Sequence, residues 1–142
     1  MRTLSVLSLF LFASFCSAHC QIPCGIYGDD ARFTAMLEDA ATLRKSITQI
    51  ETLSKEKTPN HNQLARWIAN KDAHAQKIQQ TVLDYFLAQR IKEGQPHYDK
   101  KLAHLHKIIV LAMKAKQTTD VAHVDALEAE IKAFQTLYRH KH

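Results

Sequence analysis

Glycine and proline are scarce in this sequence, which has three of each among 142 residues. Together with a hydrophobic content of 46%, this scarcity argues against a disordered chain and favours a compact, helix-rich protein. Internal repeats and low-complexity runs are also absent. At this length we expect a single domain with one hydrophobic core.

A concentrated basic surface is the second feature that the sequence lacks. Lysine and arginine outnumber aspartate and glutamate by 19 to 14, but the two signs alternate along the chain. No basic stripe with interleaved aromatic residues appears, so nothing supports nucleic-acid binding. We interpret the net charge of +5 as that of a solvated surface.

Residues 1–18 have the composition of a secretory signal peptide. Arg2 is the only charged residue among them, residues 4–15 are almost entirely apolar, and small residues precede a cut after Ala18. The apolar run is too short for an ordinary transmembrane helix. We therefore expect a removed leader and export to a periplasm, the extracellular space or an organelle lumen rather than a cytoplasmic protein. An uncleaved N-terminal anchor is the alternative.

Cysteine counting supports cleavage after Ala18. The chain has three cysteines, which would leave a spare thiol in an exported protein. Removal of the leader discards Cys16 and keeps Cys20 and Cys24 as a pair. It also makes His19 the first residue, with a free α-amine.

Beyond Gly28 the apolar residues recur at steps of three and four, as on one face of a helix. The pattern predicts helices over about Asp30 to Leu53, over Asn60 to about Glu93, around residues 102–113 and from Thr119 or Asp120 onward. The expected buried stripes are Phe33, Met36, Leu37, Ala40, Leu43, Ile47 and Ile50; Leu64, Trp67, Ile68, Ile78, Val82, Tyr85 and Phe86; Leu102, Leu105, Ile108, Ile109, Ala112 and Met113; and Val124, Leu127, Ile131, Phe134 and Tyr138.

Short polar segments separate these four stretches, and none of them alternates with the period of a strand. Asn60 and one of Asp29 and Asp30 are the expected N-caps of the first two helices. The sequence therefore predicts an all-α fold, an antiparallel four-helix bundle over residues 29–142, preceded by an irregular metal-binding hook over residues 19–28.

A chain that begins at His19 offers a divalent metal an unusual set of donors. The α-amine of His19, the amide nitrogen and thiolate of Cys20 and the thiolate of Cys24 can form a plane of two nitrogens and two sulfurs. The imidazole of His19 can reach an axial position. Such donors suit nickel or copper better than zinc. A Cys20–Cys24 disulfide in an exported structural module is the simpler interpretation of the same spacing.

The string from His19 to Tyr27, with Pro23, Cys24 and Gly25 at fixed places, resembles the nickel hook of nickel superoxide dismutases. A weaker similarity covers the rest of the mature chain and includes the segment Asp84-Tyr85-Phe86. The resemblance implies one nickel ion per chain, held by His19, Cys20 and Cys24, and a homohexamer. It also implies that Tyr27, and with it Tyr85, lies near the open face of the metal, where ordered solvent delivers protons.

The resemblance leaves open which residues hold the axial imidazole. Thr34 or Glu38, and Asn70 or Lys71, are the candidates. Gln21 and Gly28 stand where the family commonly has aspartate. The other histidines do not predict a second metal site, because no cysteine or carboxylate completes a ligand set around His97, His104 and His106.

The expected activity is disproportionation of superoxide to dioxygen and hydrogen peroxide by one-electron cycling of nickel between its divalent and trivalent states. The expected partners are superoxide as substrate, a leader-removing protease and further copies of the chain. Nucleic acid and, after cleavage, a membrane are not expected partners. The alternatives are the exported disulfide module and a carrier that binds copper or nickel at its N-terminus without turnover.

Overall fold

The computed structural model describes residues 28–139, and the regular structure in this range is entirely helical. The elements are α1 (Asp29–Ser54), α2 (His61–Gln80), η1 (Thr81–Arg90), α3 (Tyr98–Gln117) and α4 (Ala122–Arg139). The predicted all-α class is confirmed for this part of the chain. The predicted leader and all of the predicted hook except Gly28 lie outside the described residues.

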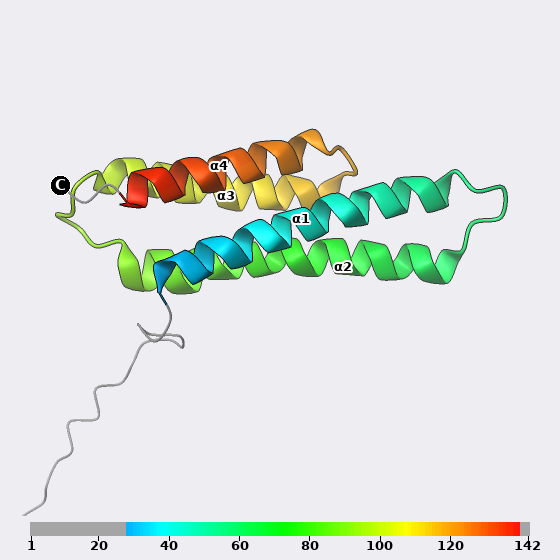
Figure 1. The fold of residues 1–142 in the computed structure, drawn as a ribbon, viewed down its shortest axis with the longest axis horizontal. Coiled ribbons are helices and arrows are strands. Elements are labelled where there is room, and N and C mark those ends of the chain that lie inside the picture. Colours follow the sequence, from blue (N-terminus) through cyan, green and yellow to red (C-terminus); the bar gives the residue numbers. More distant parts are fainter. Residues whose placement is uncertain (1–27, 140–142) are drawn as a thin grey trace, which may run out of the picture.

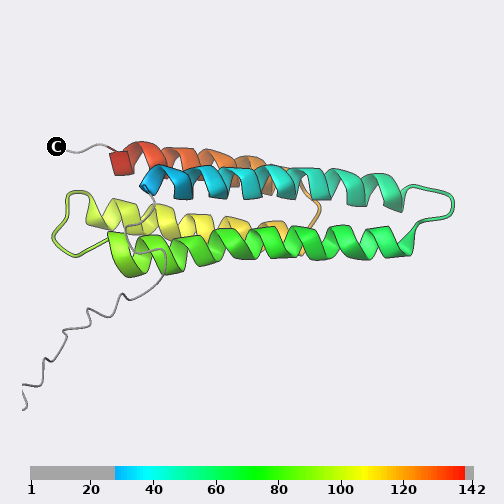
Figure 2. The same ribbon diagram turned by 60° about the horizontal axis from the view of Figure 1, so that its bottom comes forward.

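The helices pack side by side as a bundle (Figures 1 and 2). Helix α1 contacts α2 and α4, and α3 also contacts α2 and α4. The start of α1 lies at the same end of the molecule as the end of α4 and the turn between η1 and α3 (Figure 2). We call this end the base of the bundle. Within the described residues, no helix is long and apolar enough to cross a membrane.

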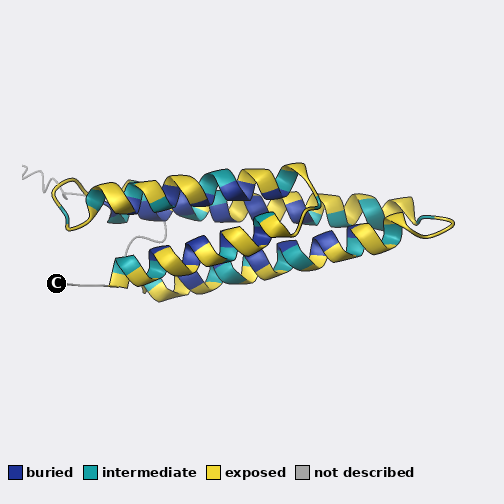
Figure 3. Cartoon of the chain, turned by 90° about the horizontal axis from the view of Figure 1, so that it is seen from above, coloured by how far each residue is buried: buried dark blue, intermediate teal, exposed yellow. Residues whose placement is uncertain are grey.

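The predicted stripes form most of the core, and the buried residues line the facing sides of the helices (Figure 3). Two predicted members of these stripes are wrong, because Ile68 and Met113 keep 46% and 41% of their surface exposed. Leu64 and Trp67 of the second stripe are half-buried. The α1–α2 pair extends past α3 and α4 near the loop of residues 55–60, so the first turns of α2 have fewer helices to cover them (Figure 1).

Aromatic rings fill the core of the bundle between α1, η1 and α4. The ring centroid of Phe33 lies 4.9 Å from that of Phe86, 5.5 Å from that of Phe134 and 5.6 Å from that of Tyr138. Tilted and edge-on rings at these separations contribute about 0.5–1.5 kcal/mol per pair beyond their buried area. This packing gives the side chains around it a rigid platform.

The second predicted helix is not α-helical throughout. Its C-terminal part, Thr81–Arg90, forms the π-helix η1 and ends three residues before the predicted limit near Glu93. At this end the amide of Ile91 donates to the carbonyl of Phe86, five residues back, at 2.9 Å. Periods of three and four in the sequence do not distinguish this wider turn from an α-helix. Single π-turns are frequent at functional sites.

The predicted N-cap is confirmed for α2 but not for α1. The side chain of Asn60 caps α2, as predicted, by accepting from the amide of Gln63 at 3.1 Å. The prediction that Asp29 or Asp30 caps α1 is wrong, because Gly28 occupies the N-cap position and has no side chain to donate or accept. Both aspartates lie in the first turn instead, where their charge favours the positive end of the helix dipole.

Candidate metal-hook site at the base of the bundle

Of the predicted site residues, only Tyr85 lies within the described part of the chain. His19, Cys20, Cys24 and Tyr27 precede it, so the metal ligands themselves remain predictions. Gly28, the last residue of the predicted hook, directly precedes α1 at the base of the bundle. The structure therefore shows the surroundings of the point where the hook is attached.

The carboxylate of Asp29, the first residue of α1, accepts two hydrogen bonds and forms one ion pair at this point. Its Oδ1 accepts from the hydroxyl of Tyr85 at 2.5 Å and lies 3.1 Å from Nε of Arg90. Its Oδ2 accepts from the hydroxyl of Tyr138 at 3.0 Å. One side chain thus connects the start of α1 to both η1 and α4.

Arg90 also contacts Tyr85 directly. Its Nη2 donates to the Tyr85 hydroxyl at 2.9 Å, and its guanidinium carbon lies 4.9 Å from the centre of the tyrosine ring. Burial and the hydrogen bond to Asp29 raise the pKa of Tyr85, and this effect outweighs the opposing effect of Arg90. The Tyr85 phenol therefore stays protonated at neutral pH.

Tyr138 has the same chemical character at the end of α4. Burial, followed by its hydrogen bond to Asp29, raises the pKa of the Tyr138 phenol well above the usual value. Close by, Arg139 binds Asp30 through Nε and Nη2 at 3.0 and 2.5 Å, on a more exposed part of the same surface. The first turn of α1 is therefore fixed to α4 by two adjacent aspartates.

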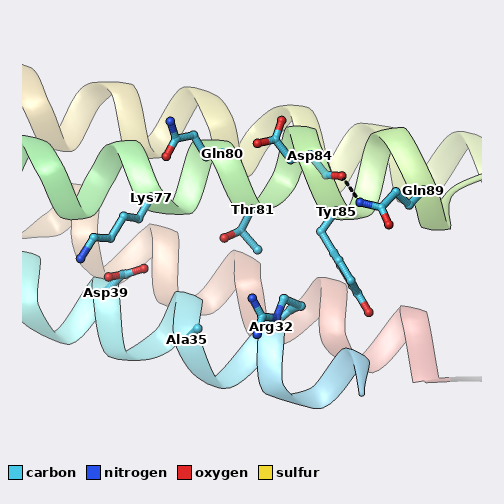
Figure 4. A pocket seen from close by; sticks show the side chains of 9 residues that line it. All are labelled: Arg32, Ala35, Asp39, Lys77, Gln80, Thr81, Asp84, Tyr85 and Gln89. Atoms are coloured by element: carbon cyan, nitrogen blue, oxygen red, sulfur yellow. Dashed lines mark hydrogen bonds between the residues drawn. The ribbon is translucent and has the colours of Figure 1, made fainter. Parts of the chain in front are cut away.

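An open hollow of about 300 Å³ lies between α1 and the α2–η1 segment (Figure 4). Arg32, Asp39, Lys77 and Asp84 contribute charges of both signs to its lining. Tyr85 lines it as well and reaches from η1 toward the start of α1 (Figure 4). Tyr85 thus borders this hollow, while its hydroxyl belongs to the group of Asp29, Tyr85, Arg90 and Tyr138, which we call the Asp29 cluster.

The residues considered for holding the axial imidazole mostly have partners elsewhere. Lys71 is buried and its Nζ donates to three carbonyls at the end of α3, those of Ala115, Lys116 and Thr118, at 2.5 to 3.1 Å. Asn70 donates to the hydroxyl of Ser46 at 3.0 Å. Lys71 stands fourteen residues before Tyr85, or about 21 Å along a helix.

The other two candidates are on α1. The hydroxyl of Thr34 donates to the carbonyl of Asp30 at 3.0 Å, within its own helix. Glu38 is exposed and contributes no ion pair among the described residues. None of the four candidates belongs to the Asp29 cluster.

A donor set for nickel is not present in the bundle itself. Within residues 28–139, no three histidine, cysteine, aspartate or glutamate side chains are grouped so that they could hold a metal. His104 pairs with Glu130 at 2.6 Å instead, and His106 is exposed. Every cysteine of the chain precedes Gly25, so thiolate ligands can come only from the N-terminal segment. The donors His19, Cys20 and Cys24 fit nickel by their chemistry.

Sequence reasoning missed Asp29, Arg90 and Tyr138 as members of the site. The sequence predicts Asp29 only as a helix cap and Tyr138 only as a member of the core stripe. The position of Asp29, two residues after Tyr27, was the available signal. The pairing of Arg90 with Tyr85 had none, because residues five apart do not share a face of an α-helix.

The described residues form a helical bundle, and every cysteine of the chain precedes it. The sequence matches the family of nickel-containing superoxide dismutases over residues 14–142, which include the predicted hook and all of the described helices. The chain belongs to this family. Its cofactor is nickel and its activity is the disproportionation of superoxide. No curated protein and no solved structure matches the chain.

Proposed function

We propose that the chain becomes a nickel superoxide dismutase when a protease removes residues 1–18 and exposes the amine of His19. The observation that carries this proposal is the family match across the hook, in a chain that has no cysteine after Cys24. His19 would then hold nickel through its amine and imidazole, Cys20 through its amide nitrogen and thiolate, and Cys24 through its thiolate.

Bound nickel supplies the one-electron steps by which one superoxide becomes dioxygen and a second becomes hydrogen peroxide. The second superoxide also takes up two protons. Tyr27 is proposed to order the solvent that delivers these protons. The Tyr85 hydroxyl donates to Asp29 and accepts from Arg90, and its pKa is raised. Tyr85 is therefore a fixed neutral phenol that orders its surroundings, and no base on the helices is needed.

The assembly and the destination of the protein are further parts of the proposal. The mature chain is proposed to form an antiparallel four-helix bundle, with the hook at its base, and to assemble as a homohexamer. The contacts of α1 and α3 with both α2 and α4 support the bundle. Exposed aliphatic residues such as Ile68, Leu83 and Met113 are available for subunit contacts. The leader supports export.

The test compares the protein that begins at His19 with a variant carrying one additional alanine before His19 and with Cys24→Ser. Nickel content and the decay of superoxide are measured on each, with circular dichroism as a check of the helices. Both variants should keep their helices, and both should lose nickel and dismutation. His61→Ala, at an exposed histidine of α2, is the matched control and should retain both.

Retained dismutation in Cys24→Ser would refute the ligand assignment. A Cys20–Cys24 disulfide and no metal after anaerobic preparation would identify the structural module instead. Stoichiometric nickel or copper without turnover would identify the carrier.

A further inference from the structure

The Asp29 cluster, formed by Asp29, Tyr85, Arg90 and Tyr138, depends on the π-helical geometry of η1. In an α-helix, two residues five apart point in directions that differ by roughly 140° around the axis. The wider turn of η1 brings Tyr85 and Arg90 to the same side, where Arg90 donates to the Tyr85 hydroxyl and both contact Oδ1 of Asp29. The π-helical turn thus allows Tyr85 and Arg90 to contact Asp29 together.

The cluster also lies at the N-terminal end of α1, where the helix has no side-chain cap. The N-cap residue Gly28 offers no side-chain hydrogen bond, so the start of α1 depends on contacts made by its first turn. The Asp29 carboxylate supplies these contacts to two separate elements, η1 and α4. The residue that immediately precedes this fixed point is Gly28, which ends the predicted nickel hook.

We propose that Asp29 is a positioning residue of the nickel site, which fixes the base of the hook and the hydroxyl of Tyr85 at the same time. This inference rests on the proposed function, since it assumes that residues 19–28 hold nickel. Asp29 acts through its neighbours. The hydroxyls of Tyr85 and Tyr138 and the ion pair with Arg90 hold its carboxylate in place. This in turn holds the first turn of α1 and the residue that enters it.

The test uses Asp29→Asn in the processed protein that begins at His19. Asparagine keeps the size of the side chain but removes the charge that pairs with Arg90. It has one acceptor oxygen and one amide group, so it cannot accept from the hydroxyls of Tyr85 and Tyr138 through two separate oxygens. Asp30→Asn is the matched control, because it is the next residue of the same turn and its side chain also joins α1 to α4 through Arg139. Thermal unfolding of the two variants shows how far each change acts on general stability.

Two measurements follow, one with the metal and one without it. The rate at which nickel passes to a competing chelator should rise about tenfold or more in Asp29→Asn and stay close to the wild-type rate in Asp30→Asn. In the metal-free protein, hydrogen exchange of the amides in residues 28–32 should accelerate in Asp29→Asn while the amides of α3 keep their protection.

The inference is overturned if Asp29→Asn releases nickel at the wild-type rate, or if Asp30→Asn releases it equally fast at a similar melting temperature. The metal-free measurement separates this failure from a failure of the proposed function. If the wild-type protein binds no nickel, the proposed function fails. Faster exchange confined to the first turn of α1 in Asp29→Asn would then still support the fixing role of Asp29, and unchanged exchange would overturn it.

Discussion

The hydroxyl of Tyr85 donates to Oδ1 of Asp29 across 2.5 Å, although the two residues are 56 positions apart in the sequence. Tyr85 lies in the π-helix η1 and Asp29 is the first residue of α1, so this hydrogen bond joins the middle of the chain to the residue that follows the predicted hook. The same hydroxyl accepts from Arg90 at 2.9 Å. A buried hydroxyl with two charged partners is expected to contribute to stability as well as to the geometry of the site.

The change Tyr85→Phe removes this hydroxyl and keeps the ring in the aromatic core. Asp29 then loses one of its donors, so the free energy of unfolding should fall by about 1.5–3 kcal/mol, the usual range for a hydrogen bond to a charged group. Urea unfolding of the metal-free protein measures this change. Tyr98→Phe, at a half-buried tyrosine of α3, should stay close to wild type.

The same Tyr85→Phe protein tests the proposed role of Tyr85 in the reaction. With nickel bound, the rate constant for superoxide decay should fall relative to both wild type and Tyr98→Phe. A wild-type rate constant, measured at the same nickel content, would restrict Tyr85 to a structural role.

Lys71 should stabilise the end of α3 and have no direct part in the nickel site. Its ammonium group replaces a helix cap by donating to three carbonyls, and burial lowers its pKa. The change Lys71→Met leaves these carbonyls without their donor and should lower the free energy of unfolding by about 1–3 kcal/mol. The exposed Lys77 of the same helix supplies the control, Lys77→Met, which should have a much smaller effect.

Nickel content distinguishes the two roles considered for Lys71. The structural role predicts that folded Lys71→Met protein binds nickel as wild type does. Loss of nickel at unchanged stability would instead indicate that Lys71 helps to hold the axial imidazole of His19.

Glu130 should make the stability of the bundle depend on acid pH. Burial acts to raise the pKa of this carboxyl, but hydrogen bonds and charge from Lys107 and His104, each at 2.6 Å, lower it below the ordinary value of 4.5. The stabilisation is therefore fully present above pH 4.5 and is lost as the pH falls through the lower folded-state pKa.

Urea unfolding of wild type and Glu130→Gln over a range of acid pH measures this contribution. The difference in unfolding free energy should be largest at about pH 6 and should shrink on acidification below the unfolded pKa. Glu38→Gln, at an exposed position of α1, should show no such trend. A difference between wild type and Glu130→Gln that does not change with pH would show that the charge of Glu130 contributes nothing.

The helices could be predicted because their apolar residues follow one period throughout. Val124, Leu127, Ile131 and Phe134 are all buried as that period requires. The pattern failed at Ile68, because burial there depends on which neighbouring helix extends far enough to cover it. The π-helix could not be predicted either, since one wider turn changes the direction of side chains without changing their spacing in the sequence.

The candidate site likewise has a part that could be predicted from the sequence and a part that could not. Donors that are adjacent in sequence, such as His19 and Cys20, can be predicted from chelate chemistry because the backbone itself sets their separation. The Asp29 cluster joins residues from α1, η1 and α4, and its contacts exist only after the helices have packed. Its members carry no sequence signature beyond being an aspartate, an arginine and two tyrosines.

Mass spectrometry of the protein purified without oxygen from its own cells tests the central claim most directly. The measurement reads the first residue, the state of the two remaining thiols and the bound metal in one experiment. The account predicts a chain that begins at His19, with Cys20 and Cys24 unoxidised and one nickel ion per chain. A chain that retains residues before His19, or one with a Cys20–Cys24 disulfide and no nickel, would contradict it.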